Sequence, residues 1–233
     1  MAQHCLRAAI SQSNYIPWKG YFDLIHLVDE FVLFDTAQYT RRDWRNRNRI
    51  KTANGPEWLT IPVVAKGRYL QSVQATEIED SSWAKRHWTA LSHAYARARY
   101  FPTYRKQFEE LYLGHHENLL SQVNYRFLIA ICGMLGIKTR FSWSSGYPAI
   151  EGKTERLVEW CKLLNATEYL TGPAARDYIN ESLFANAGIK VVYMDYSGYP
   201  EYLQLHPPFE HGVSIVDLIF NEGPDSTRYM KSF

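Results

Sequence analysis

The sequence predicts an α/β protein with a mostly parallel sheet, an inserted β-hairpin and a helical lobe. Three observations support this fold class. An apolar run, a polar turn, a helix and a second apolar run follow one another within the first 35 residues, strand and helix patterns alternate again after residue 138, and three helices are indicated between these two regions. Such alternation is typical of parallel strands that are joined by helices lying on the faces of one sheet.

The first part of the chain gives a strand, a helix and a second strand, at residues 6–10, 19–28 and 31–35. A β-hairpin follows, because Asn48–Lys51 and Trp58–Val64 flank the turn signal Asn54-Gly55. The alternation over residues 72–78 predicts one more strand.

The helical lobe is expected over about residues 81–136. Ser81 or Ser82 can cap a helix that carries a set of large side chains on roughly one face, namely Trp83, His87, Trp88, Leu91 and Tyr95. Two further helices are predicted at 103–112 and 116–135. Pro102 separates the first two helices and Gly136 ends the third, as expected for helix boundaries.

The last part of the chain returns to alternating strands and helices. Strands are predicted at 138–142, 168–171 and 190–195, and helices at 153–164, 175–187 and 214–221. The count is at least five strands in a mostly parallel, Rossmann-like sheet. The chain has no repeats or long flexible linkers, so we expect a single domain over residues 1–233.

The composition narrows the class of protein. Hydrophobic residues make up 46% and charged residues 21%, with a net charge of +2, and no apolar segment is long enough to span a bilayer. The three cysteines are scattered, which predicts neither a disulfide framework nor a zinc site and favours the cytoplasm. No dinucleotide, Walker or metalloenzyme motif is present, so we expect no metal and no cofactor. The aromatic content of 15% suggests stacking surfaces, with ordinary core packing as the alternative.

The polar turn after the first strand is the first candidate site. It carries Gln12, Asn14, Tyr15 and Lys19, which offer neutral donors and acceptors together with one cation. In an open α/β sheet, ligands bind at the carboxyl ends of the strands, where this turn is expected. The residues suit hydroxyl, amide or phosphate groups of a donor, and an ordinary capped turn is the alternative.

An arginine-rich segment at residues 41–51 is the second candidate site. It holds six cations in eleven residues, and an extended backbone would put Arg45, Arg47 and Arg49 on one side. Arginine recognises phosphate oxygens bidentately, and Trp44 could stack on a base. The expected partners are a phosphate-bearing small-molecule donor and an amine acceptor, with tRNA as a possible carrier. A solvated hairpin face is the alternative.

Asp35 and His87 are the candidate proton acceptors. Asp35 and Gln38 follow the second strand, where a carboxylate could orient an amine or act as a base. His87 lies on the aromatic-rich helix and offers an imidazole for the same role, with a structural histidine as the alternative.

Three further residues are supporting candidates. Asp217 and Asn221 are four residues apart, so they share one face of the last helix, where Asp217 could position a substrate amine or an arginine, or tie the helix to the core. Ser145 lies in a small-residue loop whose backbone amides could hold an anion.

Several separated motifs resemble the WbqC-like protein family. They are Gln12-Ser13-Asn14-Tyr15-Ile16-Pro17-Trp18-Lys19-Gly20-Tyr21-Phe22, Asp35-Thr36-Ala37-Gln38, Trp44-Arg45-Asn46-Arg47-Asn48-Arg49-Ile50, Trp58-Leu59-Thr60-Ile61-Pro62, Tyr169-Leu170-Thr171-Gly172 and Ser214-Ile215-Val216-Asp217-Leu218-Ile219-Phe220-Asn221-Glu222-Gly223. The match runs nearly end to end, and Ser13 departs from the proline usual after that glutamine. The resemblance implies a role in surface-polysaccharide biosynthesis, such as that of O-antigen, with transfer of a glycyl or related amino-acyl group to a sugar.

The function predicted from these observations is that of a transferase that moves an amino-acyl or acyl group onto an amino-sugar or related amine. A fainter likeness to Rossmann-like nucleotidyltransferases keeps an ATP-using nucleotidyltransferase or ligase as one alternative, although the histidines of their signature are missing from the Pro17–Tyr21 turn. A non-catalytic RNA-binding module is the other alternative.

Overall fold

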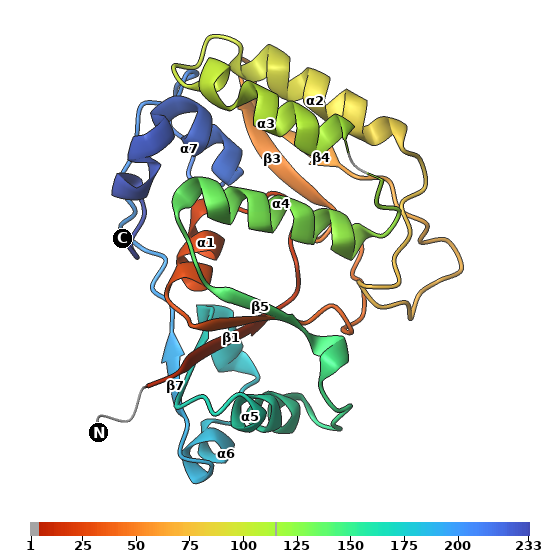
Figure 1. The fold of residues 1–233 in the computed structure, drawn as a ribbon, viewed down its shortest axis with the longest axis vertical. Helices are drawn as coiled ribbons and strands as arrows, with labels where there is room; N and C mark the ends of the chain where they lie inside the picture. Colours follow the sequence, from red (N-terminus) through yellow and green to blue (C-terminus); the bar gives the residue numbers. More distant parts are fainter. Residues whose placement is uncertain (1–4, 115) are drawn as a thin grey trace.

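The computed structural model describes residues 5–114 and 116–233, and over these residues the chain forms a five-stranded parallel sheet, a two-stranded antiparallel hairpin and seven α-helices (Figure 1). This arrangement confirms the predicted fold class, an α/β protein with a Rossmann-like sheet, an inserted β-hairpin and a helical lobe. No helix within the described residues is long and apolar enough to cross a membrane.

The sheet has the strand order β5-β2-β1-β6-β7. The strands are β1 (Arg7–Ser11), β2 (Glu30–Leu33), β5 (Arg140–Trp143), β6 (Glu168–Thr171) and β7 (Lys190–Tyr193). All neighbouring pairs are parallel, with Ile10 beside Val32 in the central pair. The chain order reverses at β1, because β2 and β5 lie on one side of it and β6 and β7 on the other. The carboxyl ends of β1 and β6 therefore flank the topological switch point.

Helices cover both faces of this sheet (Figure 1). On one face lie α1 (Lys19–His26) and α4 (Leu120–Leu135), and on the other lie α5 (Lys153–Leu163) and α6 (Glu181–Asn186). The side chains alternate accordingly: Ala9, Phe31 and Leu33 belong to one hydrophobic cluster, and Ala8, Ile10 and Val32 to the other. Burial on both faces explains why these strands are continuous apolar runs in the sequence.

The hairpin packs against the helical lobe. Its strands are β3 (Arg47–Thr52) and β4 (Gly55–Thr60), and the covering helices are α2 (Ser82–Tyr95) and α3 (Phe101–Leu113) (Figure 1). The Tyr95 hydroxyl accepts a hydrogen bond from the Lys51 amide at 3.0 Å, so α2 is tied directly to β3. The last helix, α7 (Ile215–Glu222), packs on both β3 and α3.

Three predicted elements differ from the structure. The strand predicted at 72–78 is wrong, since this segment makes only isolated bridges, such as the one between Gln38 and Ser72. The helix predicted at 175–187 is divided into a 3-10 turn, Pro173–Asp177, and the short helix α6, because the Asn180 side chain caps a new start by accepting from the Ser182 amide. Helix α4 begins at Leu120 rather than at residue 116.

Candidate functional site

A cavity of about 330 Å³ lies beside the turn that follows β1. Its walls come from three parts of the chain that are far apart in sequence. The turn supplies Asn14, Pro17 and Trp18, the segment leading into the hairpin supplies Trp44, Asn48 and Arg49, and the loop before α7 supplies Gly212. The structure thus brings together Asn14, Trp44 and Arg49 from the two candidate sites of the sequence.

A larger hollow of about 570 Å³ lies at the opposite edge of the sheet, against Val28, Lys138 and Arg140. That edge carries the amino ends of β2 and β5. Because ligands of open α/β sheets bind outside the carboxyl ends of the strands, the smaller cavity is the better candidate.

The Asn14–Pro17 turn is held in an unusual backbone conformation. Ile16 has a φ of +35°, which a β-branched residue rarely adopts. The Asn48 side-chain amide donates to the carbonyls of Tyr15 and Ile16 at 3.1 and 3.0 Å, and the Tyr15 amide donates to the Trp44 carbonyl at 3.0 Å. The hairpin segment therefore fixes the shape of the turn and of the cavity wall.

Trp18 forms the wall nearest to the switch point. Its ring packs edge-on against Tyr196 and Tyr199, with centroid separations of 5.1 and 5.4 Å. A Cβ atom on Gly20 would overlap the indole, so the missing side chain allows Trp18 to lie over the first turn of α1. Tyr196 in turn lies against Gly172, which follows β6. These rings cover the crevice between β1 and β6.

Arg49 is held in place on the hairpin side of the cavity. Its Nε donates to the Gly212 carbonyl at 2.9 Å, and its Nη2 lies 3.8 Å from a carboxylate oxygen of Glu210. The same Glu210 oxygen accepts from the Gly212 amide at 2.8 Å. A guanidinium has five N–H donors, and the contacts with Gly212 and Glu210 are those that the Arg49 guanidinium makes to acceptors within the described residues, so further donors remain for a ligand.

An exposed pair of tryptophans borders the cavity. The rings of Trp44 and Trp58 are 5.4 Å apart and tilted by 36°, and the residues are 43% and 46% exposed. The Arg47 guanidinium lies over the Trp58 ring at 4.2 Å, and that of Arg49 at 5.8 Å. Arginine beside an exposed indole is a combination that binds phosphate and a stacked ring together.

Arg45 makes different contacts from Arg47 and Arg49. It precedes β3, and its guanidinium donates to the Asn14 side chain and lies 3.5 Å from Asp43. Asn124 of α4 donates to the Arg45 carbonyl at 2.9 Å. The expectation of three arginines on one side of a strand is therefore corrected: Arg47 and Arg49 share one side of β3, while Arg45 precedes the strand and braces the turn after β1.

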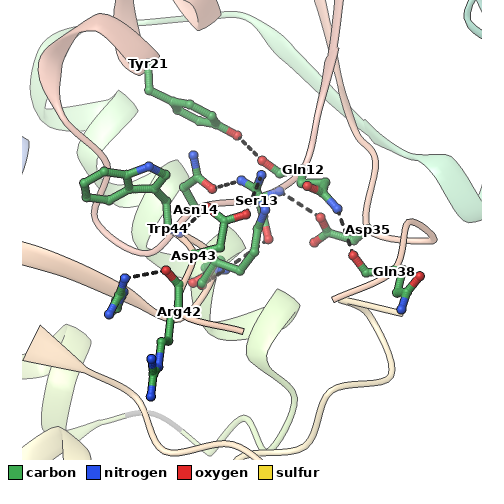
Figure 2. Close-up of polar contacts among 12 residues, drawn as sticks. Gln12, Ser13, Asn14, Tyr21, Asp35, Gln38, Arg42, Asp43 and Trp44 are labelled. Carbon is green, nitrogen blue, oxygen red and sulfur yellow. Dashed lines mark hydrogen bonds and ion pairs between the residues drawn. The ribbon is translucent and has the colours of Figure 1, made fainter. Parts of the chain in front are cut away.

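Asp35 and Gln38 lie on the other side of the turn from Trp44 (Figure 2). Asp35 is fully buried, and one carboxylate oxygen accepts from the Ser13 amide at 2.8 Å while the other has no hydrogen-bond partner among residues 5–114 and 116–233. Burial raises the pKa of this carboxyl. The Gln12 side chain donates to the Gln38 carbonyl at 3.3 Å, and the Gln38 side chain donates to the Tyr69 carbonyl at 2.7 Å. None of these three side chains lines the cavity.

Tyr15 and His87 are placed in the protein interior, which corrects the roles expected for them. Tyr15 is fully buried and His87 is 5% exposed. The Tyr15 hydroxyl contacts His87 Nδ1 at 2.9 Å and the Tyr112 hydroxyl at 2.7 Å, and His87 Nε2 contacts the Thr60 carbonyl at 3.2 Å. Burial lowers the pKa of His87 to about 4. With both ring nitrogens engaged inside the core, this histidine has none free for a substrate.

Lys19 is also buried, and it supports the site from behind. Its ammonium donates to the Pro200 carbonyl at 2.9 Å and lies 4.9 Å from the centre of the Tyr199 ring. Burial lowers the pKa of Lys19 to about 8, and nearby Asp23 opposes this shift. The expectation that Lys19 binds phosphate is corrected, because it holds the loop that carries Tyr199 against Trp18.

The supporting candidates near the end of the chain are structural as well. Asp217 is fully buried and accepts from the hydroxyls of Tyr95 and Tyr202 at 2.8 and 2.7 Å, and burial raises the pKa of this carboxyl. The Asn221 side chain donates to the Asp217 carbonyl at 2.8 Å. Ser145 is exposed after β5 and does not line the cavity.

Six residues of the site were not among the candidates from the sequence: Pro17, Trp18, Asn48, Trp58, Glu210 and Gly212. Trp58 could have been found, because the hairpin register places it opposite Arg49. No sequence signal connects Gly212 with Arg49, 163 residues earlier. Within residues 5–114 and 116–233, no three His, Cys, Asp or Glu side chains gather in a group that could hold a metal ion.

Comparison with known proteins relates the chain to one protein family. The model of the WbqC-like protein family matches residues 12–229. The chain is 49% identical over 225 residues to a Mycobacterium tuberculosis (strain ATCC 25618 / H37Rv) protein described as uncharacterized protein Rv1507c, and the alignment covers 97% of each chain. No solved structure matches the chain.

Proposed function

Since this chain belongs to the WbqC-like protein family, we propose that it is a biosynthetic transferase that binds a phosphate-bearing donor in the cavity between Asn14, Trp44 and Arg49. The group transferred is an amino-acyl group, such as glycyl, or an acyl group. The acceptor is an amino-sugar or a related amine of surface-polysaccharide or specialised-metabolite biosynthesis.

The observation that carries the proposal is the fixed position of Arg49 beside an exposed indole pair. Gly212 and Glu210 hold the guanidinium before any ligand arrives, so little conformational entropy is lost when a phosphate binds. Trp44 gives the same ligand a flat apolar surface at the cavity wall. A volume of about 330 Å³ suits a small ligand group and is at the lower end of the usual range for such sites.

The proposed reaction is an acyl transfer. The amine nitrogen attacks the carbonyl carbon of the donor ester or thioester, the new C–N bond forms, and the C–O or C–S bond breaks. The amine loses one proton, and the departing oxygen or sulfur gains one. Because Asp35 and His87 are buried, the proposal assigns proton removal to Glu210, which lies 3.8 Å from Arg49. Positioning of the two substrates supplies most of the rate.

Thermal unfolding tests the donor site with acyl-CoA as a thioester donor, UDP-sugars as candidate acceptors and ATP as the substrate of the nucleotidyltransferase alternative. A ligand at about 100 times its Kd adds roughly 2.7 kcal/mol, and each kcal/mol raises the Tm of a chain of this size by about 2–4 °C. The proposal requires a shift with a phosphate-bearing donor that Arg49→Ala abolishes and Lys138→Ala, at the opposite edge of the sheet, retains. A shift that survives Arg49→Ala contradicts it, and pyrophosphate release with ATP would support the nucleotidyltransferase alternative instead.

A further inference from the structure

We propose that the donor is carried on a single-stranded nucleic acid end, which binds along an arginine–aromatic strip that begins at the cavity and leads away from it. The strip consists of Arg41, Arg42, Trp44, Arg47, Trp58 and Tyr69. This inference rests on the proposed function, because the strip leads to the same cavity, and it names the kind of molecule that brings the transferable group.

The first stacking position of the strip is the tryptophan pair. Trp44 both lines the cavity and packs against Trp58, whose ring is contacted by the Arg47 guanidinium at 4.2 Å. Nearly half of each indole residue is exposed. Aromatic rings of this kind stack with any base, and arginine beside them binds the adjoining phosphate.

The second stacking position is Tyr69, which is 70% exposed. The Arg41 guanidinium lies 5.6 Å from the centre of its ring and donates to the Ala65 carbonyl at 2.9 Å. The Gln38 side chain donates to the Tyr69 carbonyl at 2.7 Å, and the Tyr39 amide donates to the Gln71 carbonyl at 2.9 Å. The loop that carries Tyr69 is therefore fastened to the segment that carries Arg41.

The two positions are connected through the backbone, because the Arg47 guanidinium donates to the carbonyl of Arg42, the residue next to Arg41. The charge of the strip is also uncompensated. Throughout the described part of the chain, no carboxylate lies within 4 Å of the cationic groups of Arg41, Arg42 or Arg47, in contrast to Arg49, which has Glu210.

The arrangement of the strip favours a nucleic acid over other anionic ligands. A mononucleotide would occupy the cavity and one stacking position, so it would leave the Arg41–Tyr69 pair without a role. A strand of several nucleotides presents a phosphate and a ring at each step, and this matches the alternation of guanidinium and aromatic groups. Polyanions without bases would use the arginines and leave both exposed aromatic positions unoccupied.

The experiment is fluorescence anisotropy with a labelled single-stranded RNA of about eight nucleotides, within the range of one such binding site. The test variant is Arg41→Gln/Tyr69→Ser. The matched control is Lys138→Gln/Tyr178→Ser, which likewise removes one cation and one tyrosine ring, at an exposed lysine of the opposite sheet edge and at a tyrosine that is 54% exposed. The affinity of the test variant for RNA should fall by about tenfold or more. The slope of log affinity against log salt concentration should be less steep by roughly 0.7, because one phosphate contact is lost. Its affinity for a mononucleotide should stay within about twofold of wild type, since neither residue lines the cavity.

An RNA affinity that falls no further in the test variant than in the control would overturn the proposal. So would equal competition by inorganic polyphosphate, because it would show that stacking contributes nothing. Arg49→Ala separates this inference from the proposed function. Mononucleotide affinity that is unchanged in Arg49→Ala rejects the donor site itself, whereas loss of mononucleotide binding in Arg49→Ala together with an unaffected Arg41→Gln/Tyr69→Ser variant rejects only the nucleic acid carrier.

Discussion

The guanidinium of Arg49 rests against the bare Cα atom of Gly212. Arg49 Nε donates to the Gly212 carbonyl at 2.9 Å, and a Cβ atom on residue 212 would overlap Nη2. Gly212 thus leaves the space that the guanidinium occupies, and a side chain at this position would move the end of Arg49 away. The contact joins β3 to the loop before α7, and it sets the direction of the arginine at the cavity wall.

Gly212→Ala should displace the Arg49 guanidinium and weaken binding of a nucleotide donor by about tenfold, since hydrogen bonds to charged groups contribute about 1.5–3 kcal/mol. Isothermal titration calorimetry with the donor found in the ligand panel measures this effect. The control is Gly146→Ala, where an added Cβ atom meets nothing within 4 Å. Equal affinities in the two variants would show that the position of Arg49 is unimportant for binding.

Asn48→Ala should reduce the free energy of unfolding by about 2 kcal/mol. The substitution leaves the buried carbonyls of Tyr15 and Ile16 without their donor in a turn where Ile16 already has a φ of +35°. Urea unfolding compares this variant with Asn54→Ala in the exposed hairpin turn, which should change stability by about 0.5 kcal/mol or less. Similar losses in both variants would mean that Asn48 does not stabilise the turn.

His87 should make the wild-type protein less stable in acid. The pKa of folded His87 is lowered to about 4 by burial, whereas the unfolded chain titrates near 6.5, so between these values the unfolded state binds more protons. Stability from this group is present above about pH 6.5 and is lost as the pH falls toward 4.

His87→Gln removes that dependence. Its deficit in unfolding free energy relative to wild type should therefore shrink by about 2 kcal/mol between pH 7 and pH 5, at 1.36 kcal/mol per pH unit. Urea unfolding at the two pH values gives the difference. A deficit that is the same at both would show that His87 takes up its proton equally in the folded and unfolded chains.

Asp217→Ala should cost about 3 kcal/mol or more in unfolding free energy. The change leaves the buried hydroxyls of Tyr95 and Tyr202 and the side chain of Gln204 without their acceptor. Asp225→Ala is the control, because its ion pair with Arg228 is largely exposed and should contribute less than about 1 kcal/mol. If chemical denaturation gives equal values, the buried network adds nothing to stability.

The parallel sheet could be predicted from the sequence because its strands are short apolar runs between helical segments, and burial on both faces requires such runs. The segment at 72–78 has a similar alternation, but its amides bond to a neighbouring loop: Val73 donates to the Ala37 carbonyl at 2.9 Å and Gln74 to the Asp35 carbonyl at 2.8 Å. A local pattern does not distinguish such a loop from a strand.

In the candidate site, too, features that depend on one segment could be predicted, and features that depend on distant segments could not. Asn14, Trp44 and Arg49 lie in segments whose polarity and charge are visible in the sequence, and the structure places all three around one cavity. Tyr15 and His87 look equally suited to binding. Their burial depends on Tyr112 and Thr60, partners that are distant in the chain. Burial of a polar side chain by a distant partner leaves no periodic signal.

The dependence of Arg49 on Gly212 sets an order of events during synthesis on the ribosome. The five strands of the sheet have all been synthesised before residue 212 is added, because β7 ends at Tyr193. Until then Arg49 lacks the carbonyl that fixes it, and the Arg49 carbonyl lacks the Ser214 amide that donates to it at 2.8 Å. A chain clipped by a protease before Gly212 would keep every strand and lose one wall of the donor cavity, so the site is complete only once the segment through Ser214 has been added.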